Sequence, residues 1–143
     1  MAKTKQPGRQ MANNSIPDSH RDLLLGKNFA NVATLMPDGS PQVTPVWIDL
    51  DGEDVLFNTV TTRQKALNLD RDGRVAISVF DTTNPYRYIE IRGVVDSKTT
   101  DGADANIDKL AKKYLGQEKY PGTNATDQRV IYRIKPVRVH TNG

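Results

Sequence analysis

The chain has no cysteine and only two histidines, His20 and His140, among its 143 residues. Without cysteine it can form no disulfide, no Cys-ligated zinc site and no iron–sulfur cluster, and it has no thiol for catalysis. Two histidines far apart in the sequence do not supply a His-rich metal centre. We therefore expect no metal site.

Long apolar runs are also missing. No stretch approaches the roughly 20 apolar residues that span a bilayer, and the polar N-terminus lacks the apolar segment of a signal peptide. The motifs GxSxG, GxGxxG and GxxxxGK[ST] do not occur, so nothing indicates a nucleophilic triad or a dinucleotide fold. The sequence predicts a cytoplasmic protein that does not bind membranes.

The small excess of positive charge lies at the N-terminus. The chain has 20 Lys and Arg against 17 Asp and Glu, a net charge of +3, and Lys3, Lys5 and Arg9 account for all of it. Residues 1–14 show no periodicity, and we expect a disordered basic leader there. Residues 15–143 are then a single neutral domain, which argues against nucleic acid as a partner.

Alternating apolar and polar residues predict six β-strands separated by turn residues. Hairpin turns at residues 37–40 and 51–52 join the first three strands into an antiparallel meander. Gly93 suggests a bulge in the fifth strand, and Pro136 suggests an edge or a bend in the last. The predicted strands span residues 29–36, 41–50, 55–60, 74–80, 87–97 and 128–140.

Helical spacing and capping residues predict a few short helices between these strands. Thr61 or Thr62 is the expected N-cap of the second helix, and Gly116 is the expected stop of the third. Six antiparallel strands with a few short helices are typical of a small, mainly β barrel. The helices are expected at about residues 17–25, 62–70 and 103–115.

The charges of the predicted helix at 62–70 oppose the helix dipole. Arg63 and Lys65 fall in its first turn and Asp70 and Asp72 at its end, whereas the dipole favours the reverse by roughly 0.3–1 kcal/mol per charge. A bound anion resolves the conflict, because free N–H groups, a threonine hydroxyl and two cations together suit a phosphate. A solvated surface helix is the alternative interpretation.

Two aromatic groups are candidates for contacting a planar ring. The segment at 84–88 combines two tyrosines and an arginine with a proline, and a loop anchored by aromatic packing is the alternative interpretation. Trp47, the only tryptophan, lies in the second strand beside Pro45 and Val46. Three locations are open for this side chain: a pocket for a planar ring, the core, or a dimer interface.

Three segments of the chain occur in an order that resembles a known family. They are PDGSPQVTPVWID (Pro37–Asp49), NTVTTRQKALNLDRDGRVAIS (Asn58–Ser78) and NPYRYIEIRGVV (Asn84–Val95). Together they resemble the pyridoxamine 5′-phosphate oxidase-like split β-barrel family. Within it they are most similar to the actinobacterial F420-dependent flavin/deazaflavin oxidoreductase branch (FDOR-B type).

The resemblance implies a homodimer of six-stranded split barrels with FMN or coenzyme F420 bound at the interface. It places the cofactor phosphate near the start of the helix after the third strand, the ring along the second strand, and polar contacts to the ribityl chain at the end of the third strand. Residues 84–88 are expected to come from the second protomer. The implied cofactor-binding residues are Pro45, Val46, Trp47, Ile48, Asn58, Thr59, Thr62, Arg63, Lys65, Asn84, Pro85, Tyr86, Arg87 and Tyr88.

The reaction that the resemblance implies is hydride transfer from reduced coenzyme F420, a deazaflavin, to an electron-poor organic acceptor. No acid–base side chain is obligatory, and Tyr86, Tyr88 or a bound water is a candidate proton donor. The vitamin B6 oxidases of the family carry an arginine in the second strand, which this chain lacks. An FMN-binding oxidoreductase on the same barrel and an F420 carrier without turnover are the alternatives.

Overall fold

The computed structural model describes residues 14–143, so residues 1–13 of the expected leader lie outside the described residues. The strands of the described chain are β1 (Ala30–Leu35), β2 (Pro41–Val46), β3 (Ile48–Asp51), β4 (Asp54–Val60), β5 (Arg74–Asp81), β6 (Asn84–Thr99) and β7 (Arg129–Asn142). Its helices are the 3-10 turn η1 (Asp18–His20), α2 (Arg21–Leu25), α3 (Gln64–Arg71) and α4 (Ala103–Leu115). None of these helices is long and apolar enough to cross a membrane.

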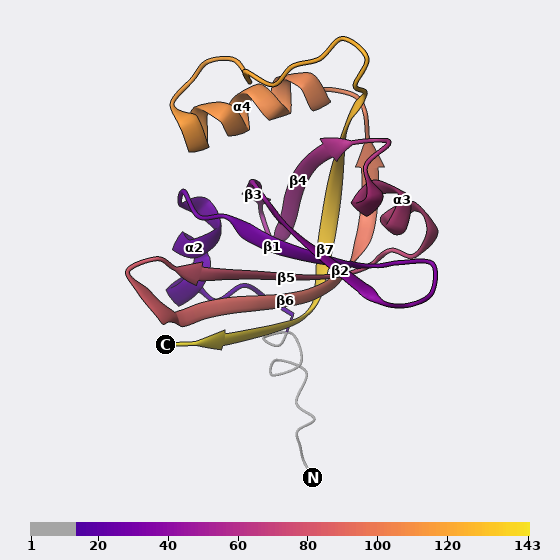
Figure 1. Ribbon diagram of the computed structural model, residues 1–143. Helices are drawn as coiled ribbons and strands as arrows, with labels where there is room; N and C mark the ends of the chain where they lie inside the picture. The colour runs from indigo at the N-terminus through magenta and orange to yellow at the C-terminus, as the bar shows by residue number, and fades with distance from the viewer. Residues whose placement is uncertain (1–13) are drawn as a thin grey trace.

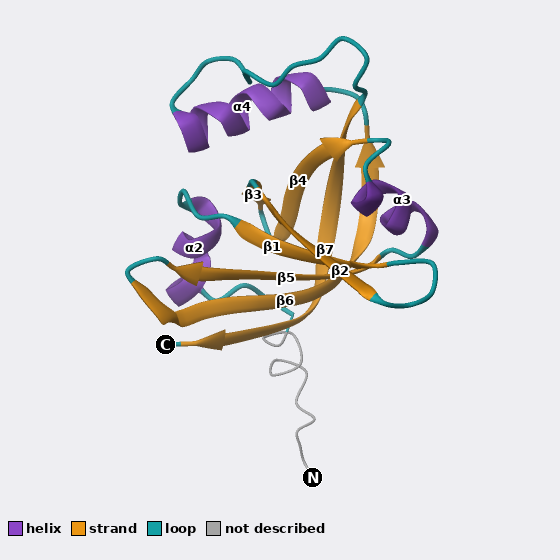
Figure 2. Ribbon diagram, in the orientation of Figure 1, coloured by secondary structure: helices purple, strands orange, loops and turns teal. Residues whose placement is uncertain are grey.

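All of these strands belong to one curled antiparallel sheet, which confirms the predicted mainly β split barrel (Figures 1 and 2). The strand order is β2-β1-β5-β6-β7-β4-β3. The expected hairpins are present, since β2 pairs with β1 and β3 pairs with β4. The predicted helix at 103–115 matches α4 at both ends.

The two edges of the sheet meet at one residue. β2 and β3 lie at opposite edges of the strand order, yet Trp47 alone separates them in the chain. The prediction of one continuous strand over residues 41–50 is therefore wrong, and six expected strands become seven. The physical reason is pairing: Val46 lies opposite Ala30 of β1, whereas Ile48 lies opposite Phe57 of β4.

The long strands β6 and β7 bend together in the middle of the sheet. Their register shifts between Arg92 and Gly93, where Gly93 lies opposite Pro136. This confirms the predicted bulge and shows that Pro136 marks a bend rather than an edge. Proline is tolerated there because pairing between β7 and β4 already ends at Ile134.

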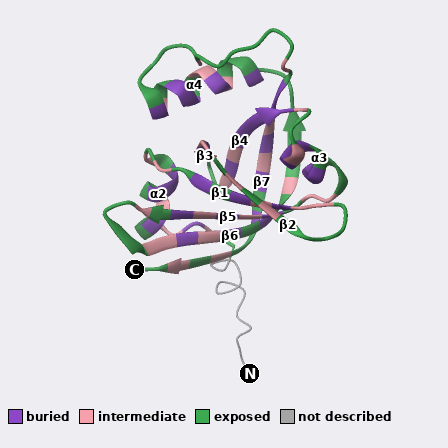
Figure 3. Ribbon diagram, in the orientation of Figure 1, coloured by how far each residue is buried: buried purple, intermediate pink, exposed green. Residues whose placement is uncertain are grey.

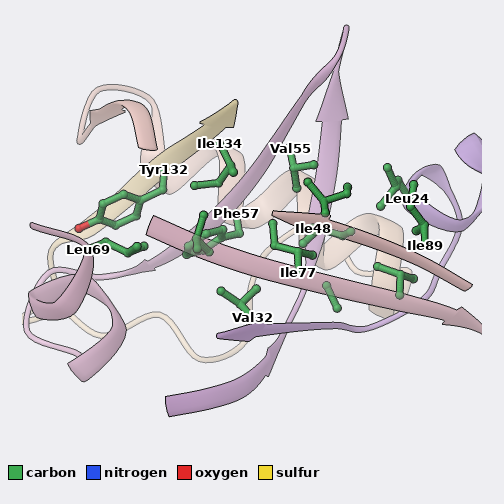
Figure 4. Packing of buried hydrophobic residues seen from close by; sticks show 14 of the residues in the cluster. Leu24, Val32, Ile48, Val55, Phe57, Leu69, Ile77, Ile89, Tyr132 and Ile134 are labelled. Atoms are coloured by element: carbon green, nitrogen blue, oxygen red, sulfur yellow. The ribbon is translucent and has the colours of Figure 1, made fainter. Parts of the chain in front are cut away.

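The larger of two apolar clusters fills the inside of the curled sheet (Figure 4). Its largest side chains are Phe57 and Tyr132, whose ring centroids lie 5.6 Å apart. The Tyr132 hydroxyl donates a 2.8 Å hydrogen bond to Asp70 and so joins α3 to β7. Figure 3 shows that β1 and β4 are largely buried, as strands that face this core must be.

A second, smaller cluster holds α4 against one end of the sheet. Its buried members are Ile107, Leu110 and Tyr114, and Trp47 and Tyr120 pack against them. Hydrogen bonds reinforce the contact: the Tyr114 hydroxyl donates to the Asn28 carbonyl at 2.7 Å and accepts from the Ile48 amide at 3.1 Å. In Figure 1, α4 lies above β3 and β4.

Helix α3 begins later than expected. Its N-cap is Arg63, with extended backbone and no side-chain capping bond, so the prediction of a Thr61 or Thr62 cap is wrong. The reason is that the Thr61 amide donates to the Gln128 carbonyl and the Arg63 amide to the Val60 carbonyl. These bonds continue the turn after β4 through both threonines before the helix can start.

We expect Gly93→Ala to destabilise the protein by about 1–3 kcal/mol, because a methyl group there overfills a packed bulge. A Cβ at Gly93 would lie 2.5 Å from the Lys135 carbonyl oxygen and 3.0 Å from Ile134. Gly73→Ala is the matched control, since its Cβ would meet Val95 at an ordinary 3.5 Å. Urea unfolding of both variants measures the difference, and equal stability of the two would contradict this account of the bulge.

Candidate functional site

A pocket of about 230 Å³ opens where the two sheet edges meet. Distant parts of the chain build it: the end of β2, the Trp47 junction, the end of β4, the start of α3, α4, and the start of β7. Its lining residues are Phe29, Pro45, Val46, Trp47, Asn58, Thr59, Arg63, Lys65, Ile107, Tyr120 and Arg129.

Three cations line this pocket and no acidic residue does. They are Arg63, Lys65 and Arg129, and the last two are each only 9% exposed. Buried charges are normally paired, because taking an ion out of water costs several kcal/mol. We call these three side chains the cation cluster.

Lys65 is the least compensated member of the cation cluster. Among the described residues its ammonium makes no hydrogen bond and no ion pair. Burial lowers the pKa of Lys65 below its usual 10.5, and the nearby Arg63 guanidinium lowers it further. An anion in the pocket would supply the missing counter-charge.

Arg129 is held in place by neutral groups. Its guanidinium lies 4.8 Å from the centre of the Tyr120 ring, and it donates a 3.4 Å hydrogen bond to the Asn58 side-chain oxygen. The Asn58 amide nitrogen in turn donates to the Ala103 carbonyl at 2.8 Å and to the Asn106 side-chain oxygen at 3.0 Å. Neither contact neutralises the charge, so Arg129 is oriented but still free to bind an anion.

Thr59 contributes a hydroxyl that has no partner. Its side-chain oxygen is buried and makes no hydrogen bond among the described residues, and the residue is 2% exposed. Leaving such a group unsatisfied costs about 1–3 kcal/mol. Because Thr59 lines the pocket beside the cation cluster, a ligand oxygen there would satisfy it.

The other side of the pocket is aromatic. Trp47 stacks on Tyr114 with ring centroids 5.2 Å apart and only 5° between the ring planes. Tyr120 meets Trp47 edge-on at 5.8 Å. These ring contacts hold the Trp47 side chain in place. Its flat ring lines the pocket beside Pro45.

Seven of the fourteen residues expected at the cofactor meet in this pocket. Of the other seven, Ile48 is fully buried in the core, Thr62 is an exposed turn residue outside the lining, and five belong to the segment at 84–88. Those that the structure brings together are Pro45, Val46, Trp47, Asn58, Thr59, Arg63 and Lys65.

The aromatic segment at 84–88 lies away from this pocket. It forms the start of β6 rather than a loop, and the Arg87 guanidinium forms ion pairs with Asp22 at 2.6 Å and Asp81 at 3.2 Å. Tyr86 is 81% exposed, and the Tyr88 ring lies 6.0 Å from that of His140. A contribution of this segment to a partner's site stays a prediction.

Only one end of α3 carries the charge pattern expected of an anion site. Lys65 does lie in a first turn without any acid. Asp70, however, accepts hydrogen bonds from Lys98 at 2.8 Å and from Tyr132, and Arg71 also lies in the last turn. Local partners therefore explain the acid at the C-terminal end, and only the first turn indicates an anion.

Four lining residues were not predicted from the sequence. Arg129 lies on the same face of β7 as Arg133 and Lys135, which are more exposed, so alternation gave no sign of its burial. It is buried because α4 and the segment after it pack over the start of β7. The residues missed are Phe29, Ile107, Tyr120 and Arg129.

Comparison with known proteins agrees with the fold. The sequence model of the family described as pyridoxamine 5′-phosphate oxidase matches residues 16–143. A solved structure named F420 reductase is 35% identical, with a TM-score of 0.78 over 87% of this chain and 98% of that one. No curated protein matches the chain.

More distant structures share the fold alone. A conserved hypothetical protein from Mycobacterium tuberculosis is 22% identical, with a TM-score of 0.69 over 93% of this chain and 88% of that one. HupZ from Group A Streptococcus is also 22% identical, with a TM-score of 0.65 over 88% of this chain and 93% of that one.

We expect Thr59→Val to stabilise the ligand-free protein by about 1 kcal/mol, because it removes a buried hydroxyl that has no partner. The same change should reduce the stabilisation that inorganic phosphate gives, since a donor to the anion is lost. Thr34→Val is the matched control: the Thr34 hydroxyl accepts a 3.0 Å bond from Asn68, so this variant should be destabilised. Thermal unfolding with and without phosphate measures both effects. Loss of stability in ligand-free Thr59→Val would contradict the assignment.

Proposed function

The chain belongs to the pyridoxamine 5′-phosphate oxidase family, and we propose that it is an oxidoreductase that binds coenzyme F420 and reduces an electron-poor organic acceptor. The observation that carries this proposal is the cation cluster, two of whose three members are buried, in a pocket that no described carboxylate lines. The family and its F420 reductase neighbour suggest F420 or FMN as the cofactor, and both carry a phosphate.

The pocket fits a phosphate group by three independent features. Lys65 and Arg129 are buried cations without acidic partners, and Arg63 adds a third, more exposed charge. The Thr59 hydroxyl has no partner. The first turn of α3 has no capping side chain, so its N–H groups add partial positive charge at the same place.

Each part of the pocket then has a physical task. The cation cluster and Thr59 bind the phosphate, and Asn58 holds Arg129 toward it rather than contacting the ribityl chain itself. Pro45, Val46 and Trp47 provide a flat surface for a ring. Bound reduced F420 supplies the hydride, while the protein orients the two reactants and excludes water.

We further propose that the protein is a homodimer. The outer face of the sheet carries an apolar groove of about 440 Å³, with Val94 and Val137 exposed in it and Arg74 and Arg92 at its sides. Exposed apolar surface of this kind marks an interaction site. A partner seated there could bring its own exposed Tyr86 to the cofactor, as the resemblance implies.

The choice of F420 over FMN rests on the 35% identical F420 reductase. A titration of the purified protein with each cofactor decides it. We expect the protein to quench the fluorescence of added F420 and to bind F420 more tightly than FMN. A yellow protein that retains FMN through gel filtration and leaves F420 unquenched would establish the FMN-dependent alternative.

Replacing Arg63, Lys65 or Arg129 by alanine should weaken F420 binding by about 1–3 kcal/mol in each case, because each removes a charge-assisted contact. Arg71→Ala is the matched control: Arg71 lies on the same helix, but it donates to the Leu35 carbonyl and does not line the pocket. Fluorescence titration measures the four affinities. Unchanged affinity in all three cluster variants would move the phosphate site elsewhere.

Turnover separates an enzyme from a carrier. The protein loaded with reduced F420 is offered quinones, enones and tetrapyrroles, and reoxidation of the cofactor is followed. We expect at least one of these acceptors to be reduced. Tight F420 binding with no reduction of any of them would favour the carrier.

A further inference from the structure

A second pocket lies next to the pocket of the cation cluster, and Trp47 lines both. Its volume is about 480 Å³, about twice that of the first, and the two pockets share Phe29, Pro45 and Trp47. Its lining comes from the segment before β1, from β2, from the turn between β5 and β6, and from the end of α4. The lining residues are Lys27, Asn28, Phe29, Asn31, Pro45, Trp47, Phe80, Thr82, Tyr114 and Leu115.

This second pocket presents exposed aromatic rings. Phe29 is 62% and Phe80 44% exposed, although each is a large apolar side chain. Phe29 stacks on Tyr114 with ring centroids 5.8 Å apart, and Tyr114 stacks on Trp47 in turn. Stacked rings with open faces favour a flat apolar ligand.

One charge lies in this aromatic pocket, and it is positive. Lys27 makes no hydrogen bond or ion pair with any described residue, and no carboxylate lines the pocket. The Asn28 side-chain nitrogen donates to the Leu23 carbonyl, and the Tyr114 hydroxyl donates to the Asn28 carbonyl. Lys27 is therefore the one charged group that can recognise a ligand there.

We propose that this second pocket binds the hydride acceptor, and that the acceptor is a planar apolar molecule with one anionic group, such as a carboxylate, directed at Lys27. The inference rests on the proposed function, because a cofactor with its phosphate at the cation cluster and its ring along Pro45 and Trp47 lies beside this pocket. In that reaction a C–H bond of the reduced cofactor breaks and a C–H bond forms on the acceptor, so the hydride carries both electrons, the cofactor is oxidised, and a proton from water completes the reduced product.

The charges that line the two pockets favour different ligands. The cation cluster, with three positive charges, suits a phosphate, whereas a single exposed lysine among aromatic rings suits a monoanion attached to a large apolar body. A carboxylate on a flat ring system would gain stacking on Phe29 or Phe80 and one ion pair with Lys27. A phosphate gains little in this pocket.

Calorimetric titration of the full chain tests the proposal with two matched probes, naphthalene-2-carboxylate and the uncharged naphthalen-2-ylmethanol. We expect the carboxylate to bind about threefold to fivefold more tightly than the alcohol. Lys27→Met should remove this preference and leave the affinity for the alcohol unchanged. Lys135→Met, at an exposed lysine of β7 outside the pocket, should retain the preference.

Inorganic phosphate distinguishes the two pockets in the same experiment. In excess it should leave naphthalene-2-carboxylate binding unchanged, because it occupies the cation cluster. Displacement of the carboxylate by phosphate, or an undiminished preference in Lys27→Met, would overturn the proposal and leave the cation cluster as the only anion site. Failure of either probe to bind the wild-type protein would also overturn it.

The proposed function fails in a different way. If neither F420 nor FMN binds while the carboxylate preference still depends on Lys27, the cofactor assignment is wrong and the aromatic anion site remains. If F420 binds but displaces the carboxylate, the second pocket holds the cofactor ring and the acceptor assignment is overturned.

Discussion

A single residue joins the two opposite edges of the β-sheet, and this short connection constrains the whole molecule. β2 ends at Val46 and β3 begins at Ile48, so the chain can pair with β1 on one side and β4 on the other only if the sheet curls until its edges meet. The bend of β6 and β7 at Gly93 and Pro136 gives the sheet that curvature. The edge strands β2 and β3 do not pair with each other at this junction. Both candidate pockets lie there and share Pro45 and Trp47.

Three cations line the pocket at this junction, and no acidic residue of the described chain lines it with them. The fold domain is neutral overall, and most of its surface cations lie near a carboxylate, as Lys98 does near Asp70 and Lys109 near Asp49. Lys65 and Arg129 are buried and form no ion pair with any described residue. Such an arrangement is costly in the ligand-free protein, and a site that binds an anion is its simplest physical explanation. The apolar core that Phe57 and Tyr132 anchor provides the stability that tolerates this cost.

Most strands, the bulge at Gly93 and helix α4 could be predicted from the sequence, because each depends on a local residue pattern or on one glycine. The break between β2 and β3 at Trp47 could not be predicted. Residues 41–50 alternate well enough for one strand, and only their pairing with distant strands divides them in two. Arg63 and Lys65 were found through the helix dipole, a local signal. Arg129 and Tyr120 were missed because α4 and the following segment, rather than any pattern in β7, create their environment.

Lys65 is buried without a counter-charge among the described residues, and the pKa of its ammonium tests most directly whether an anion binds beside it. In the ligand-free protein, burial and Arg63 hold that pKa below 10.5. Nuclear magnetic resonance of the labelled lysine side chain during a pH titration measures it with and without a phosphate-bearing cofactor. We predict a lowered pKa in the free protein that rises when the cofactor binds, because the phosphate stabilises the charged form. A pKa that is ordinary in the free protein, or that does not change on binding, would contradict the account.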